Sequence, residues 1–180
     1  MPSLHQDLLI QAAHLADLDK NKPKQANLRR AISSAYYALF HFLITESLDV
    51  VASGSDQKVK YQLRRSFAHK DMKGVCKEYA VATGNPPAQI NKNLNKLFNA
   101  AIQSEIKNTA KLFCELQEFR HAADYDLSDK FYRTQVKTLL TRVSQAIAVD
   151  WPALNAAPAA KRNREVFLTD LAFRGRWERN

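Results

Sequence analysis

The stretch Leu28–His41, which reads LRRAISSAYYALFH, predicts a long helix with two different faces. Apolar residues recur in and just after it at steps of three and four, the spacing of one face of a helix. Polar and aromatic residues recur at the same spacing on a second face. We therefore expect a helix over residues 25–50 that packs against two neighbours. The apolar series is Ile32, Ala35, Tyr36, Leu39 and Leu43, and the polar series is Arg30, Ser34, Tyr37 and His41.

Helices are also predicted on both sides of this segment, and no stretch alternates as a β-strand would. Ser3 and Gln6 have the spacing of a capping box, which predicts a first helix from residue 4 to about residue 20. The other expected helices cover 56–82 as two short helices, then 100–125, 129–150 and a last amphipathic segment within 161–180. The predicted fold class is an all-α, up-and-down helical bundle. Residues 1–150 would form the bundle, and residues 151–180 a basic C-terminal hinge and helix packed on it.

Composition narrows the class of protein further. Of the 180 residues, 46% are hydrophobic, a fraction that excludes a disordered chain. Only four are glycine, which argues against β-sandwiches, barrels and Gly-rich phosphate loops. The 27 Lys and Arg against 18 Asp and Glu give a net charge of +9. This excess says nothing of the fold but indicates an anionic partner.

The cellular compartment and the need for a cofactor can be predicted from a few residue types. Cys76 and Cys114 form no C-x-x-C pair, as expected in a reducing compartment. The residues after Met1 do not resemble a signal peptide, and no apolar stretch is long enough to span a membrane. The five histidines are scattered without metal-ligand spacing. We expect a cytoplasmic protein with no membrane association, no metal and no cofactor.

A second informative group lies at the predicted end of the helix over 100–125. Arg120 and Asp124 are four residues apart, and so are His121 and Tyr125, so each pair shares a helix face. One interpretation is an intrahelical ion pair beside a terminal aromatic residue. The other is a site in which the Arg fork holds a phosphate while an imidazole and a phenol exchange protons.

Together, Leu28–His41 and the segment FRHAADYD at 119–126 resemble the second helix and the later R-x-x-A-D-Y segment of small prokaryotic HEPN proteins, the higher eukaryote and prokaryote nucleotide-binding family. The resemblance covers roughly residues 1–150. It implies an up-and-down helical bundle, commonly a homodimer. Catalytic members carry an Arg followed after four to six residues by a His, and this pair forms a metal-independent ribonuclease site. Many act in toxin–antitoxin or defence systems beside a nucleotidyltransferase-like partner.

The resemblance, together with the chemistry of the side chains, suggests roles for residues of this chain. Arg120 matches the motif Arg and would hold a phosphate, whereas Tyr125 stands where the motif His is expected. His121 or His41 would transfer protons, Asp124 would orient Arg120 or a histidine, and Tyr125 would hydrogen-bond or stack on a base. The ligand-binding face of the long helix, with Arg30, Ser34 and Tyr37, would face these four residues of the later helix.

The segment from 58 to 77 is strongly basic. It contains seven Lys and Arg against one Asp, a net charge of +6. Arg64, Arg65 and His69 lie in it, and Arg64 and His69 repeat the Arg-x4-His spacing outside the late helix where the family motif belongs. A segment of this kind most often forms a solvated basic face, and the functional interpretation is a surface that binds phosphate.

Two hypotheses of function follow. The first is a HEPN-like protein that binds RNA or a nucleotide, with metal-independent cleavage of RNA as its catalytic form. The second is a non-catalytic HEPN-like binding or assembly module, or an adaptor for a protein partner. The absence of the motif His favours the second, and the +6 segment favours contact with RNA in either case.

Overall fold

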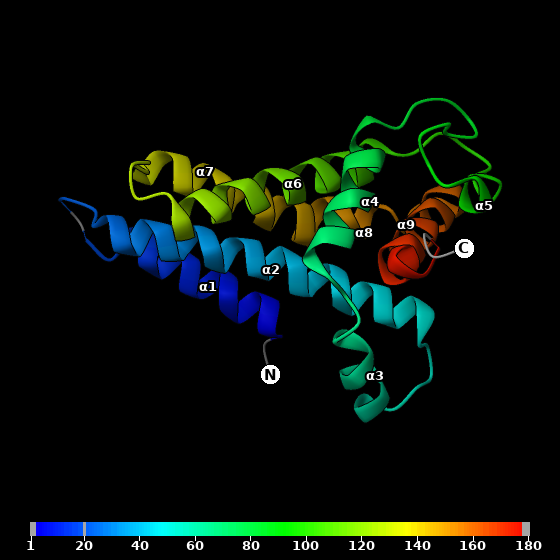
Figure 1. Ribbon diagram of the computed structural model, residues 1–180, viewed down its shortest axis with the longest axis horizontal. Coiled ribbons are helices and arrows are strands. Elements are labelled where there is room, and N and C mark those ends of the chain that lie inside the picture. The colour runs from blue at the N-terminus through cyan, green and yellow to red at the C-terminus, as the bar shows by residue number, and fades with distance from the viewer. Residues whose placement is uncertain (1–2, 20, 178–180) are drawn as a thin grey trace. The chain divides into compact units, whose positions relative to one another are not determined.

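The computed structural model describes residues 3–19 and 21–177, and within these ranges the chain is helical with no β-strand (Figure 1). The predicted all-α bundle is confirmed. The helices are α1 (Leu4–Asp17), α2 (Gln25–Val51), α3 (Gln57–Arg64), α4 (His69–Val81), α5 (Lys92–Asn95), α6 (Ser104–Tyr125), α7 (Arg133–Gln145), a π-helical turn η1 (Ala146–Asp150), α8 (Trp151–Ala153) and α9 (Pro158–Trp177). Lys20 and residues 178–180, which the predicted first and last helices included, lie outside the described residues.

Two compact units make up the chain. The first contains residues 1–42 and 112–149, and the second contains 43–111 and 150–180. This grouping differs from the predicted division into a bundle over 1–150 and a C-terminal segment over 151–180. The division near residue 150 recurs, but the residues beyond it share a unit with 43–111.

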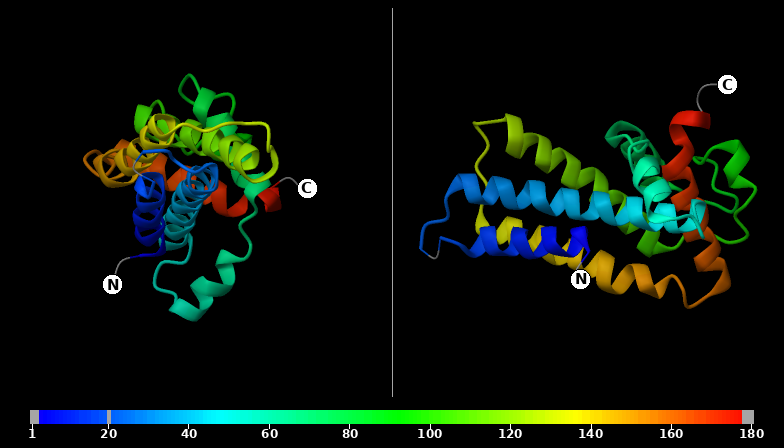
Figure 2. Two further views of the ribbon diagram at one scale, coloured as in Figure 1. Left: turned by 90° about the vertical axis from the view of Figure 1, so that its left-hand side faces the viewer. Right: turned by 90° about the horizontal axis from the view of Figure 1, so that it is seen from below.

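The first unit is built from two helical hairpins. α1 leads into the first part of α2, and the last part of α6 leads into α7; the views in Figures 1 and 2 show these segments running alongside one another. The apolar series of the long helix is buried, as its spacing predicts, and all of it except Leu43 lies in this unit. Tyr36 lies 5.6 Å from Phe113, and Phe40 lies 6.5 Å from the same ring, measured between ring centroids. These aromatic contacts join α2 to α6 in the core of the unit.

Arg29 holds the end of α6 and the loop that follows it. Its Nη1 donates hydrogen bonds to the carbonyl oxygens of Ala122, Ala123 and Asp126, at 3.3, 2.9 and 2.8 Å, and its Nη2 donates to that of Asp129. The last carbonyls of a helix have no partner within the helix, so a guanidinium at this place satisfies them and complements the negative end of the helix dipole.

Gln25 fixes the far end of the same loop. Its Nε2 donates to the carbonyl of Phe131 at 2.8 Å, and its Oε1 accepts the backbone N–H of Phe131 at 3.0 Å. The guanidinium of Arg29 also lies 5.2 Å from the centre of the Phe131 ring. The first two turns of α2 thus hold the connection between α6 and α7.

In the second unit, α4 packs against α9. Tyr79 and Phe167 are both buried, with ring centroids 4.7 Å apart. Beside them, the buried Arg174 is hydrogen-bonded through Nη2 to Asp170 Oδ2 at 2.7 Å and to Glu78 Oε2 at 2.8 Å. Burial of the Tyr79 phenol, reinforced by the charge of Asp170, raises its pKa, so this tyrosine stays neutral.

Part of the predicted hinge after residue 150 is a short helix that is held in place by side-chain contacts. Trp151 begins the short helix α8, is buried, and donates from Nε1 to Glu46 Oε2 at 2.8 Å. Its ring also contacts Phe167 of α9, with centroids 6.2 Å apart. Residues 154–157 form the actual connection, and α9 starts at Pro158, earlier than predicted.

Replacing Arg29 by Ala should lower the free energy of unfolding by about 1–3 kcal/mol, because the carbonyls at the end of α6 lose a charged donor. Arg30→Ala is the matched control: Arg30 is the exposed neighbour, and its loss should cost less than about 0.5 kcal/mol. Urea-induced unfolding followed by circular dichroism measures both. Equal losses in the two variants would contradict the role given to Arg29.

Replacing Arg174 by Ala should cost about 3–5 kcal/mol, because the buried carboxylate of Asp170 would lose its partner. The double variant Arg174→Met, Asp170→Leu should recover most of this loss, since no unpaired charge is left in the buried position. Lys161→Ala, at an exposed position of α9, controls for loss of a positive charge. A single-variant loss below about 1 kcal/mol would show that the Arg174 network does not hold α9.

Candidate functional site

Arg120 lies between two tyrosine rings in the first unit. Its guanidinium carbon is 5.7 Å from the centre of the Tyr37 ring and 5.8 Å from that of Tyr125. Tyr37 belongs to α2, whereas Arg120 and Tyr125 belong to α6. A cation between two aromatic faces is attracted by both and has few alternative positions.

Polar contacts fix the same guanidinium. Arg120 Nε lies 2.7 Å from Asp124 Oδ2, but its N–H is not aligned with an acceptor, so the contact is ionic rather than a hydrogen bond. Arg120 Nη2 donates to the Tyr37 hydroxyl at 3.3 Å. Ser33 Oγ, also on α2, donates to Asp124 Oδ1 at 2.7 Å. We call Ser33, Tyr37, Arg120, Asp124 and Tyr125 the Arg120 cluster.

Burial and neighbouring side chains shift the pKa of Arg120 in opposite directions. Burial lowers its pKa, and the neighbouring Tyr37, Asp124 and Tyr125 raise it by more, so the pKa lies above the ordinary arginine value. The side chain remains 26% exposed. Within the described part of the chain, no hydrogen-bond acceptor meets Nη1 of this arginine. The cluster therefore presents a permanent positive charge with donors still available at its outer edge.

Two histidines extend this arrangement on either side. His41 stacks on Tyr37, with centroids 6.2 Å apart and planes 26° apart. His121 lies against Tyr125, with centroids 5.0 Å apart. The side chains thus follow one another in the order His41, Tyr37, Arg120, Tyr125, His121. All four residues proposed for catalysis take part in this row, and each imidazole contacts a tyrosine next to the arginine.

The polar face of α2 differs in register from the predicted one. The polar contacts to α6 come from Arg29, Ser33 and Tyr37, and His41 continues the series at the same step of four. Ser34 instead donates to Gln11 of α1 at 3.0 Å, and Arg30 is exposed. Contact along an i, i+4 row is the common way in which helices pack. The predicted contact between α2 and α6 is therefore present, but Ser34 and Arg30 are not part of it.

Sequence reasoning missed Arg29 and Ser33 for an identifiable reason. Each is followed by an identical residue, Arg30 and Ser34, so the doublets allow two registers about 100° apart on the helix. A step of four taken backwards from Tyr37 selects Ser33 and Arg29. This uniform step of four would have identified the polar residues of α2 that face α6.

The three candidate ligand-binding residues of the basic segment 58–77 lie in the second unit. Arg64 ends α3 and donates from Nη2 to Thr45 Oγ1 at 3.3 Å, while Arg65, which follows it, is exposed. His69 begins α4 and is exposed. These three residues therefore do not belong to the unit that contains the Arg120 cluster.

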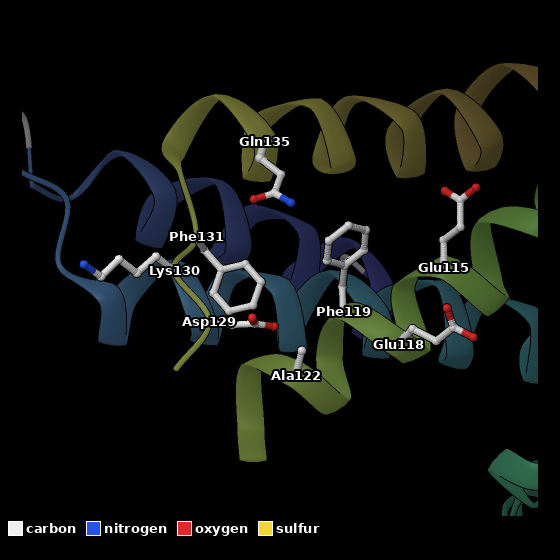
Figure 3. Close-up of a pocket in the computed structure, with 8 residues that line it drawn as sticks. All are labelled: Glu115, Glu118, Phe119, Ala122, Asp129, Lys130, Phe131 and Gln135. Atoms are coloured by element: carbon white, nitrogen blue, oxygen red, sulfur yellow. The ribbon is translucent and has the colours of Figure 1, made fainter. Parts of the chain in front are cut away.

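A cavity of about 390 Å³ occupies a different face of α6, between this helix, the following loop and α7. In Figure 3 Asp129 lies beside the ring of Phe131, and Glu115 and Glu118 lie on the far side of Phe119. Glu115 is paired with Arg142 at 2.7 Å. The cavity is acidic on balance, so it does not suit the anionic ligand that the net charge of the chain indicates.

Within residues 3–19 and 21–177, no three His, Cys, Asp or Glu side chains gather as metal ligands do. In the same ranges, no helix is both long and apolar enough to cross a bilayer. Comparison of the chain with protein-family models, with curated proteins and with solved structures finds no match.

Proposed function

We propose that this protein is a HEPN-like module that binds RNA or a nucleotide at the Arg120 cluster. The observation that carries the proposal is the fixed charge of Arg120 beside the ring of Tyr125, which is 66% exposed. A phosphate would be bound by the outer edge of the guanidinium, and a base would stack on the exposed face of the tyrosine.

The two contacts suit the two parts of a nucleotide. Arginine presents donors in a planar fork that matches the oxygens of a phosphate. An exposed aromatic ring accepts any base by stacking, which contributes about 1–3 kcal/mol per base. Because Tyr37 and Asp124 already position Arg120, little conformational entropy remains to be lost when the phosphate binds. The same cation would strengthen stacking on Tyr125 through its contact with the ring.

The relation to HEPN proteins is supported by the contact between the two segments that carry the resemblance. Ser33 and Tyr37 come from the first segment, and Arg120 and Asp124 from the second, and their side chains meet. Binding without chemistry is the form of the function that this geometry supports best. Asp124 occupies one side of Arg120, and Tyr125 stands at the position of the motif His.

Cleavage of RNA is the second candidate, and the imidazoles that contact Tyr37 and Tyr125 favour it. In such a reaction the ribose 2′-hydroxyl attacks the adjacent phosphorus and loses its proton to one histidine. The bond to the 5′-oxygen breaks, and that oxygen takes a proton from the same imidazolium or from water. Arg120 would stabilise the charge on the phosphoryl oxygens in the transition state. His41 or His121 is the proton carrier in this scheme.

Tyr125→Ala should weaken binding of a fluorescently labelled single-stranded RNA about 5- to 150-fold, because one stacked base is lost. Tyr132→Ala is the matched control, since Tyr132 is 67% exposed and belongs to the same unit without contacting Arg120. Fluorescence anisotropy measures both variants, and Tyr125→Phe should retain binding. Unchanged affinity in Tyr125→Ala would refute the binding site.

RNA incubated with the protein in EDTA should be cut only if the catalytic form of the proposal is correct. Loss of that cleavage in either His121→Ala or His41→Ala, with RNA binding retained, would identify the altered histidine as the proton carrier. If RNA stays intact at high protein concentration while binding persists, the catalytic form is refuted and the non-catalytic binding module is supported. Gel analysis of mixed transfer and messenger RNA provides the measurement.

A further inference from the structure

Two polar pairs join the helix α3 to α2. Lys60 Nζ donates to Asp49 Oδ1 at 2.6 Å, and Arg64 Nη2 donates to Thr45 Oγ1 at 3.3 Å. Both pairs join residues of the second unit, four residues apart on each helix. No residue of α3 is buried. Core packing therefore does not explain the sequence of α3.

Three exposed side chains lie on another face of this segment. Lys58, Tyr61 and Arg65 follow one another at steps of three and four and occupy an arc of roughly 60° on a helical wheel. Tyr61 is 65% exposed, and Lys58 and Arg65 are exposed as well. Neither cationic side chain forms an ion pair or hydrogen bond with the described residues. We call Lys58, Tyr61 and Arg65 the α3 face.

We propose that the α3 face is a second nucleic-acid-binding surface, which takes a single strand. Lys58 and Arg65 are about 10 Å apart along the helix axis, with the ring of Tyr61 between them. A strand whose base stacks on Tyr61 carries a phosphate on either side of that base, within reach of both cations. The charge is complementary, since residues 58–77 carry a net +6.

The exposed ring is what selects a single strand. In a duplex the faces of the bases are covered by their neighbours, so Tyr61 would have nothing to stack on and only the two cations would contribute. An anionic membrane is the competing occupant. It is disfavoured because only Val59 and Leu63 supply exposed aliphatic surface on α3, at 46% and 39%, too little for an apolar face that inserts into lipid.

The proposal goes beyond the Arg120 cluster and does not rest on it. The two surfaces belong to different units, and each contains one exposed tyrosine next to a cation. Their tyrosines can be removed separately. The affinity of Tyr61→Ala reports on the α3 face, and the affinity of Tyr125→Ala reports on the Arg120 cluster, so the failure of one proposal is distinguishable from the failure of the other.

The test measures anisotropy of labelled oligouridylate, oligothymidylate and a mixed-sequence duplex, each about a dozen nucleotides long. Tyr61→Ala should weaken binding of the single strands about 5- to 150-fold and leave the duplex within about twofold. Tyr61→Phe should bind as the unaltered chain does. Tyr132→Ala controls for loss of an exposed tyrosine, and circular dichroism checks that each variant is folded.

The cations are tested by the dependence on salt between about 50 and 200 mM. Lys58→Ala, Arg65→Ala together should reduce the slope of log affinity against log salt by roughly 1.4, since each phosphate contact on a single strand contributes about 0.7. Lys92→Ala, Lys96→Ala removes the same charge from exposed positions of the same unit and should change the slope less.

Several results would overturn the proposal. The first is unchanged affinity for single strands in Tyr61→Ala, and the second is equal weakening of single strands and duplex. The third is the absence of single-strand binding by the unaltered chain at about 50 mM salt. A fourth is binding to phosphatidylserine vesicles that Tyr61→Ala abolishes while binding of oligonucleotides stays intact, which would assign the α3 face to a membrane. Equal binding of oligouridylate and oligothymidylate supports the α3 face as a reader of single strands irrespective of sugar.

Discussion

The geometry of the first unit depends on the hydrogen bonds from Arg29 to the carbonyls at the end of α6. A helix terminus exposes several acceptors, and a loop that follows it adds more. One guanidinium near the start of α2 binds acceptors from both, and Gln25 binds the loop one turn earlier. Asp124 and Tyr125 are the last residues of α6, so their positions are set by this contact. The Arg120 cluster is thus placed by a structural arginine that takes no part in the proposed ligand contacts.

The ion pair between Arg120 and Asp124 has two opposite effects on a ligand. It holds the guanidinium in place between the two tyrosines, which favours binding of a phosphate by a preorganised donor. It also cancels part of the positive charge that would attract that phosphate. A bound phosphate must therefore share Arg120 with a carboxylate that Ser33 keeps in position. This arrangement suits reversible binding of a strand with many phosphates, each held weakly, better than tight capture of one.

Helix periodicity was enough to predict the longer helices, but not the short helices α5 and α8 or the face that each helix presents. The bounds of α2 agree with the sequence to within a residue, since its apolar series is long and Pro23 lies just before it. The register of its polar face was wrong because Arg29-Arg30 and Ser33-Ser34 fit two faces equally. For α9, the mixture of charged and apolar residues predicted an amphipathic helix packed on the bundle, without buried charges. The burial of Asp170 and Arg174 depends on their pairing with each other and with Glu78, far away in sequence. The π-helical turn after α7 contains no glycine or proline from which it could have been predicted.

The helix α3 makes polar contacts with α2 within the second unit, and none of its residues is fully buried, so the chemistry of its exposed face is separate from the stability of the protein. Substitutions at exposed positions that touch no core change the free energy of unfolding little. Mutations can therefore alter the charge or the aromatic content of the α3 face without a selective penalty from folding. Such a segment can diverge faster than the helices around it, so that related chains with the same core would differ in the polymers they contact. The most variable part of this fold would then be the part that chooses the partner.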